Sequence, residues 1–117
     1  MSENHDLCLH IDQADPALLK FLLGNAANYF KGLPGATFQL DVVANGPAVT
    51  LFTAENEALR AQAKPLVEAG MRIKLCANAI AATGVDKSAL WPECRIVPAG
   101  LVEIVKLQNA GFAYIKP

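Results

Sequence analysis

The sequence has few features that connect a chain with membranes, nucleic acids or nucleotides. No apolar stretch approaches the length that spans a bilayer, and the polar residues 1–6 lack the basic-then-apolar order of a signal peptide. Lysine and arginine occur singly and the net charge is −1, so neither a nucleic acid nor a membrane is an expected partner. Neither a G-x-G-x-x-G segment nor a Walker loop occurs, and no cofactor is expected.

Cysteines and metal ligands are also scarce. The three cysteines are an odd number without close pairing, which suits a reducing compartment better than a disulfide framework. The cytoplasm is therefore the expected location. His5 and His10 lie at or in the first expected strand, and Cys8 beside them does not complete a zinc site. No metal site is predicted.

The composition is apolar for a small chain. Its 117 residues are 53% hydrophobic and only 18% charged, and the length fits a single domain over residues 1–117. A small domain has much surface for its volume, so the apolar excess is either exposed or covered by another subunit. This favours a homo-oligomer, and the alternative is a solitary, well-filled core.

Short β-type runs alternate with helical stretches. The helix expected over about 16–30 is apolar on more than one face, which predicts burial against the sheet and against a neighbouring subunit. The run 49–52 is predicted to be extended, and Pro65 is predicted to kink or split its helix. The expected strands are 7–11, 37–44, 71–76, 95–97 and 112–115, and the other expected helices start near 53, 77 and 100, with a turn or short helix over 85–91.

Strands separated by helices of this length predict an α/β fold with a largely parallel sheet and helices on both faces. In such sheets, binding and chemistry gather beyond the carboxyl ends of the strands. Asn45 and Gly46, the segment Cys76 to Asn78, and the segment 98–100 are expected at that edge.

Cys76 is the residue that best fits a chemical role. It is expected where a strand ends and a short helix begins, and free N–H groups at a helix start stabilise a thiolate. By alternation Lys74 and, further away, Arg72 share its face of the strand. Either Cys76 is a reactive thiol or it is a small buried hydrophobe. Cys8 is expected to pack in its strand, and Cys94 is expected in an exposed loop.

The segment Leu75-Cys76-Ala77-Asn78-Ala79-Ile80, closed by Gly84, resembles the cysteine segment of DsrE/DsrF-like proteins, including the sulfur-transfer subunit of the tRNA 2-thiouridine relay. The compact length and the ending 114–117 are more similar to the standalone branch of this family than to its three-subunit relay complex. Other segments that carry the resemblance, in the family's order, are 45–49, 66–71, 97–100 and 108–117.

The resemblance implies a three-layer α/β/α domain with a five-stranded, largely parallel sheet, assembled as a homotrimer or homohexamer. It also implies that Cys76 accepts sulfane sulfur from a donor protein as a persulfide and passes it to an acceptor. In this hypothesis Lys74 activates the thiol, while Asn78, Asn45, Gly46 and Gly100 support the site or bind ligand. The alternative is a non-catalytic oligomeric module of the same fold that binds a small ligand or a protein.

Overall fold

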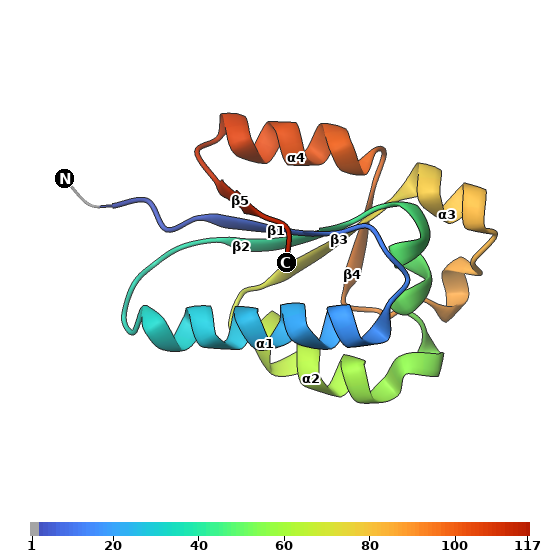
Figure 1. Cartoon of the computed structure of the whole chain (residues 1–117), viewed down its shortest axis with the longest axis horizontal. Helices are drawn as coiled ribbons and strands as arrows, with labels where there is room; N and C mark the ends of the chain where they lie inside the picture. The colour runs from blue at the N-terminus through green and yellow to red at the C-terminus, as the bar shows by residue number, and fades with distance from the viewer. Residues whose placement is uncertain (1–2) are drawn as a thin grey trace.

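The computed structural model describes residues 3–117 and contains a five-stranded sheet with helices on both faces (Figure 1). The strand order is β4-β3-β2-β1-β5, and every pairing between neighbouring strands is parallel. The predicted α/β fold with a five-stranded parallel sheet is confirmed. The strands are β1 Leu7–Ile11, β2 Leu40–Ala44, β3 Arg72–Cys76, β4 Cys94–Val97 and β5 Ala113–Ile115.

The helices form two layers around the sheet. Helices α1 (Pro16–Gly32) and α2 (Glu57–Glu68) cover one face, and α4 (Gly100–Asn109) covers the other (Figure 1). The short helix α3 (Ala77–Thr83) follows β3 directly, with the 3-10 helix η1 (Gly46–Leu51) in contact with it. Two further 3-10 turns are η2 (Ala54–Asn56) and η3 (Lys87–Ala89).

Strand alternation divides the buried residues between the two faces of the sheet. On the α1 and α2 side, strand residues such as Leu9, Val42 and Ile73 join the main hydrophobic core. On the α4 side, the smaller apolar cluster is accompanied by polar side chains at His10, Asp41 and Lys74. That smaller cluster consists of Cys8, Val43, Ile104, Leu107 and Phe112. The α4 side is therefore the polar side of the sheet.

One local prediction is wrong, and so is the predicted split of the second helix. Residues 49–52 are not extended, because Pro47 fixes its backbone φ and Gly46 adopts a φ of +58°, and together they start the 3-10 helix η1. Pro65 does not split α2, which is continuous from Glu57 to Glu68. The proline lies on the exposed side of α2, where water can satisfy the carbonyl group that its missing N–H leaves free.

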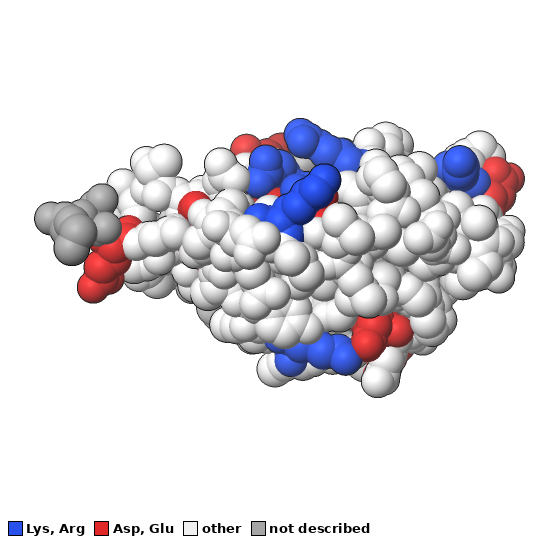
Figure 2. All heavy atoms as spheres, turned by 90° about the horizontal axis from the view of Figure 1, so that it is seen from above, with Lys and Arg blue, Asp and Glu red and all other residues white. Residues whose placement is uncertain are grey.

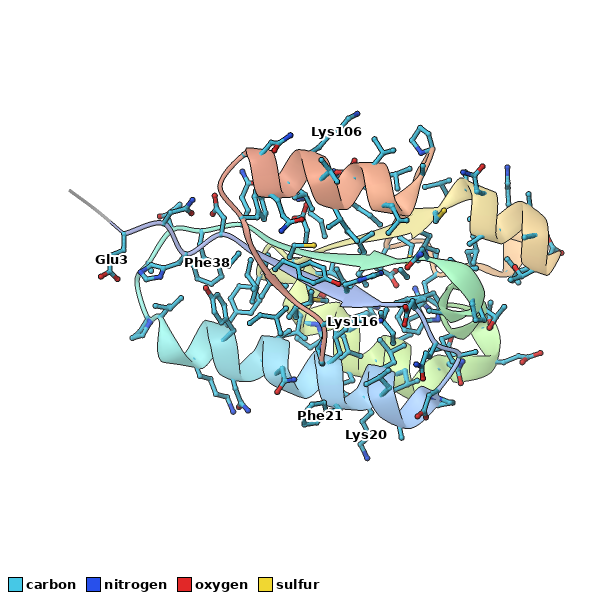
Figure 3. All side chains as sticks on the ribbon, turned by 45° about the horizontal axis from the view of Figure 1, so that its top comes forward. Glu3, Lys20, Phe21, Phe38, Lys106 and Lys116 are labelled. Atoms are coloured by element: carbon cyan, nitrogen blue, oxygen red, sulfur yellow. The ribbon has the colours of Figure 1, made fainter. Side chains whose placement is uncertain are left out.

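Within the single chain, helix α1 buries the face that packs on the sheet; its predicted burial against a neighbouring subunit stays a prediction. The side of α1 that faces the core carries Leu19, Leu22, Leu23 and Ala26. Phe21 projects away from the sheet and is 60% exposed (Figure 3).

Helix α4 also exposes apolar side chains, at Leu101, Val102 and Val105. Figure 2, seen from the α4 side, shows charged side chains in separate places with uncharged surface between them. We call Leu101, Val102 and Val105 the α4 apolar surface. Among residues 3–117, no helix is long and apolar enough to cross a membrane.

Candidate functional site

A pocket of about 340 Å³ opens at the carboxyl edge of the sheet, between the ends of β2 and β3 and the start of α4. It brings together five of the six predicted site residues, and only Lys74 is not among those that line it. Within the described chain, no cluster of three His, Cys, Asp or Glu side chains is placed to hold a metal ion. The lining residues are Asn45, Gly46, Cys76, Asn78, Ala79, Ala82, Ala99, Gly100 and Leu101.

Cys76 is the last residue of β3 and the N-cap residue of α3. The residue is 6% exposed, and it forms part of the pocket wall. Helix α3 begins immediately after it, but this helix has only seven residues. The local sequence thus places a buried thiol, which also packs against the main hydrophobic core, in the wall of the pocket.

Gly100 lets α4 approach the sheet closely at this point. A Cβ atom added at Gly100 would lie 3.0 Å from the Cβ atom of Asn45 and 3.3 Å from that of Cys76. Both distances are shorter than ordinary van der Waals contact, so glycine is the residue that fits. Asn45 and Cys76 consequently both lie against the same point on α4.

The first turn of α4 contributes backbone donors to the pocket. Its N-cap residue, Ala99, has no side chain that could accept a hydrogen bond from the helix start. The first N–H groups of a helix have no partner within the helix and carry partial positive charge. Because Ala99, Gly100 and Leu101 line the pocket, this helix start favours an anion there.

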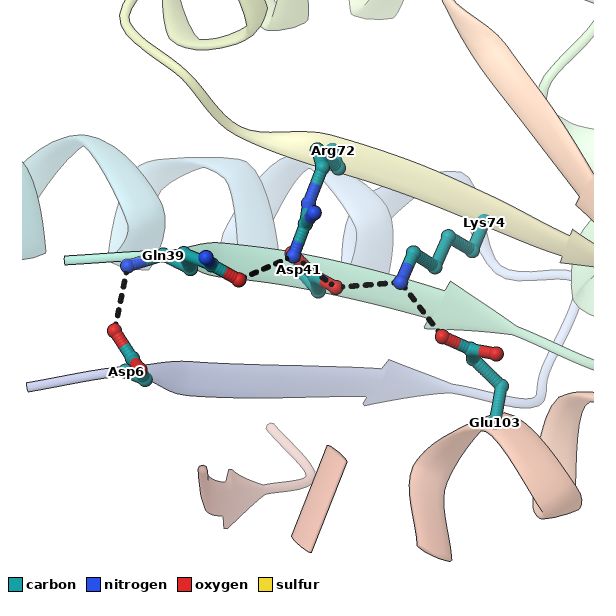
Figure 4. A network of polar contacts seen from close by, with 6 residues as sticks. All are labelled: Asp6, Gln39, Asp41, Arg72, Lys74 and Glu103. Carbon is teal, nitrogen blue, oxygen red and sulfur yellow. Dashed lines mark hydrogen bonds and ion pairs between the residues drawn. The ribbon is translucent and has the colours of Figure 1, made fainter. Parts of the chain in front are cut away.

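Lys74 lies in a buried ion cluster (Figure 4) and not in the pocket wall. Its Nζ atom is 2.8 Å from Asp41 Oδ2 and 2.6 Å from Glu103 Oε2. Arg72 also donates to Asp41, from Nε at 2.7 Å and from Nη2 at 3.0 Å. Asp41 is fully buried, so its charge needs these partners. The ammonium of Lys74 is thus committed to two carboxylates, which weakens its predicted role as the activator of Cys76.

The other two cysteines are poorly placed for thiol chemistry. Cys8 is fully buried, as predicted, and burial together with the charge of Asp41 raises its pKa to about 12. Cys94 is not in an exposed loop. It begins β4, is half-buried, and burial raises its pKa to about 12 as well. Neither is ionised appreciably near neutral pH.

His10 is not among the predicted site residues, yet it is hydrogen-bonded to one of them. Its Nε2 atom is 2.6 Å from Asn45 Oδ1, and its Nδ1 atom is 2.6 Å from the hydroxyl of Tyr114. Topology could have indicated this residue, since His10 pairs with Val43 in the sheet, two residues before Asn45. The sequence alone shows only a histidine in an apolar strand.

Comparisons with known proteins agree with this architecture. A sequence model described as the DsrE/DsrF-like family matches residues 8–117. The chain is similar to MTH1491 of Methanobacterium thermoautotrophicum, a protein of unknown function, with 28% identity, a TM-score of 0.87, and coverage of 97% of this chain and 100% of that one. The ychN protein of E. coli has a similar fold, with 13% identity, a TM-score of 0.72, and coverage of 97% and 99%. Among curated proteins, none matches the chain.

Proposed function

The chain belongs to the DsrE/DsrF-like family, and on this basis we propose that it is a sulfur carrier that holds sulfane sulfur as a persulfide on Cys76. This family is associated with sulfur relay. The observation that carries the proposal is the position of Cys76 in the wall of a pocket that also contains the start of α4. Both other thiols have pKa values of about 12.

The reaction is an exchange at sulfur without net oxidation. The Cys76 thiolate attacks the outer sulfur of a donor persulfide, R–S–SH, and a new S–S bond forms. The donor's own S–S bond breaks, and R–S⁻ leaves with the electron pair. In the return step, an acceptor thiolate attacks the outer sulfur of the Cys76 persulfide, and Cys76 leaves as a thiolate.

The pocket suits the anions that this chemistry requires. Its lining residues are all uncharged, and they include the uncapped first turn of α4 and the carboxamides of Asn45 and Asn78. N–H groups that face a reacting anion stabilise it without reorganisation of solvent. A persulfide on Cys76 therefore has donors nearby and no lining carboxylate to repel it.

Labelling after sulfur transfer tests this function. The reduced protein is incubated with glutathione persulfide, trapped with iodoacetamide, digested, and analysed by mass spectrometry. We expect the trapped persulfide on the peptide that contains Cys76, while Cys8 and Cys94 are recovered as unmodified or simply alkylated thiols. A persulfide on Cys94 with none on Cys76 would reject the assignment.

We also propose that the protein self-assembles, as a homotrimer or homohexamer, and acts in the cytoplasm, where its thiols stay reduced. The α4 apolar surface supports assembly, because three large aliphatic side chains on one helix are exposed in the single chain. Light scattering should report more than one chain per particle, and Val105→Glu should lower that number. Ala61→Glu, which adds the same charge at an exposed position of α2, is the control.

A second function deserves a direct test, namely a non-catalytic module that binds a small ligand or a protein. The engagement of Lys74 by Asp41 and Glu103 favours it, because the expected activating cation is occupied. This function predicts that Cys76→Ser leaves ligand or partner binding unchanged. Sulfur carriage predicts that the same variant loses sulfur exchange with both donor and acceptor proteins.

A further inference from the structure

His10 is a buried histidine with both ring nitrogens engaged. The residue is 6% exposed and lies on the α4 side of the sheet. Nδ1 is 2.6 Å from the Tyr114 hydroxyl, and Nε2 is 2.6 Å from Asn45 Oδ1. The chain of contacts therefore runs from β5, through β1, to the residue that follows β2 at the pocket.

The partners determine where the protons lie. An amide oxygen only accepts, so the Nε2–H group of His10 donates to Asn45 Oδ1. Burial raises the pKa of Tyr114, which keeps its phenol protonated, and the Tyr114 hydroxyl can donate to Nδ1 of the neutral ring. The tautomer with hydrogen on Nε2 therefore satisfies both contacts.

This arrangement also sets the orientation of the Asn45 carboxamide. With Oδ1 turned to His10, the two N–H donors on Nδ2 are left for other partners, and none of the hydrogen bonds within residues 3–117 uses them. Asn45 and Cys76 line the same pocket, and both lie close to Gly100. A carboxamide rotated by half a turn would present its oxygen instead, which repels an anion.

We propose that His10 is a positioning residue, which holds the Asn45 carboxamide so that its N–H donors face the sulfur anion carried at Cys76. This inference rests on the proposed sulfur-carrier function and adds to it. His10 itself does not line the pocket, so it acts through Asn45. Tyr114 acts one step further away, because its hydroxyl holds the other ring nitrogen by a hydrogen bond.

The test compares the rates of two reactions at Cys76, sulfur uptake from glutathione persulfide and alkylation. Alkylation is measured with iodoacetate, an anion, and with iodoacetamide, which is neutral. A hydrogen bond to a charged group is strong enough that losing it slows uptake about tenfold or more. We expect this slowing in His10→Ala, together with a lower ratio of iodoacetate to iodoacetamide rates.

His10→Gln distinguishes positioning from a structural role. The glutamine amide can donate to Asn45 Oδ1 as Nε2–H does, so it should restore both the uptake rate and the reagent ratio. If His10 only packs, His10→Ala lowers the free energy of unfolding but leaves the reagent ratio of the folded protein unchanged. That result would overturn the inference, as would a failure of His10→Gln to restore the ratio. If His10→Ala does not fold, Tyr114→Phe, which removes only a hydroxyl, should lower the ratio in the same direction.

The two proposals fail in different ways. If the wild-type protein takes up no sulfur, the carrier function is wrong, and the reagent ratio still decides whether His10 orients donors at Cys76. If the wild-type protein takes up sulfur and neither uptake nor the ratio changes in His10→Ala, the role of His10 is wrong and the carrier function stands.

Discussion

Replacing Gly100 with alanine places a methyl group where α4 meets the pocket at Cys76. The new Cβ atom would lie 3.0 Å from Asn45 Cβ, 3.3 Å from Cys76 Cβ and 3.6 Å from Val43 Cγ1. The first two neighbours are Cβ atoms, attached directly to backbone, and cannot move aside by a change of side-chain rotamer. Helix α4 or the ends of β2 and β3 must therefore shift.

The size of the effect follows from two opposed contributions. Overpacking a close contact costs about 1–3 kcal/mol. The higher helix propensity of alanine offsets this cost by at most about 0.5–1 kcal/mol of unfolding free energy. The offset is smaller at the first residue of a helix than in its interior. We expect Gly100→Ala to lower the free energy of unfolding by about 1–2 kcal/mol. We also expect slower sulfur uptake at Cys76, because the start of α4 is displaced.

Gly24→Ala is the matched control. Gly24 lies inside α1, and a Cβ atom added there meets nothing within 4 Å. The same substitution should therefore raise the free energy of unfolding by about 0.5–1 kcal/mol and leave sulfur uptake unchanged. Urea unfolding followed by circular dichroism measures both variants. A stabilisation of similar size in the two would refute the close approach of α4 at Gly100.

Three further predictions concern charge and thiol chemistry. Asp41→Ala removes the carboxylate that Arg72 and Lys74 share, leaves Lys74 paired with Glu103 alone, and should lower the free energy of unfolding measured in urea by about 3 kcal/mol. A loss well below 1 kcal/mol would contradict a buried ion cluster. Hydrogen bonds from Arg60 lower the pKa of Glu93 in the folded protein below its ordinary value of 4.5. The ion pair therefore stabilises the fold fully above pH 4.5, and this stabilisation is lost as the pH falls through the pKa of Glu93 in the folded protein. Wild type should exceed Glu93→Gln in unfolding free energy at pH 7, with the difference vanishing in acid; a difference independent of pH would be inconsistent with this. With pKa values of about 12, Cys8 and Cys94 are ionised to about one part in ten thousand at pH 8, so peptide mapping should find both alkylated far more slowly than a free thiol such as glutathione. Equal rates would contradict their burial.

Much of the fold follows from local signals in the sequence. Asp15 and Pro16 mark the start of α1, where the Asp15 carboxylate accepts a hydrogen bond from the N–H of Ala17. Gly84 ends α3 with a φ of +71°, a conformation that favours glycine. These signals act within a few residues, so they can be read without knowledge of the fold. The parallel sheet then follows from the alternation of strands and helices.

The site was only partly predictable, because its remaining contacts join distant parts of the chain. The alternation of side chains along β3 correctly places Lys74 on the opposite face of the sheet from the core residues Ile73 and Leu75. It does not show that the carboxylate of Glu103 in α4 reaches the Lys74 ammonium. The link between His10 and Tyr114 depends on the strand order, which places β5 beside β1. Such contacts require the topology as well as the pattern.

Intact-protein mass spectrometry tests the central claim most directly. The reduced proteins are incubated with glutathione persulfide and freed of excess reagent; they are wild type, Cys76→Ser and Cys94→Ser. The mass of each is measured before and after addition of an acceptor thiol. Sulfur carriage predicts one added sulfur atom per chain in wild type and in Cys94→Ser, lost to the acceptor thiol, and none in Cys76→Ser. Equal sulfur uptake by wild type and Cys76→Ser, or no uptake by any of the three, would contradict it.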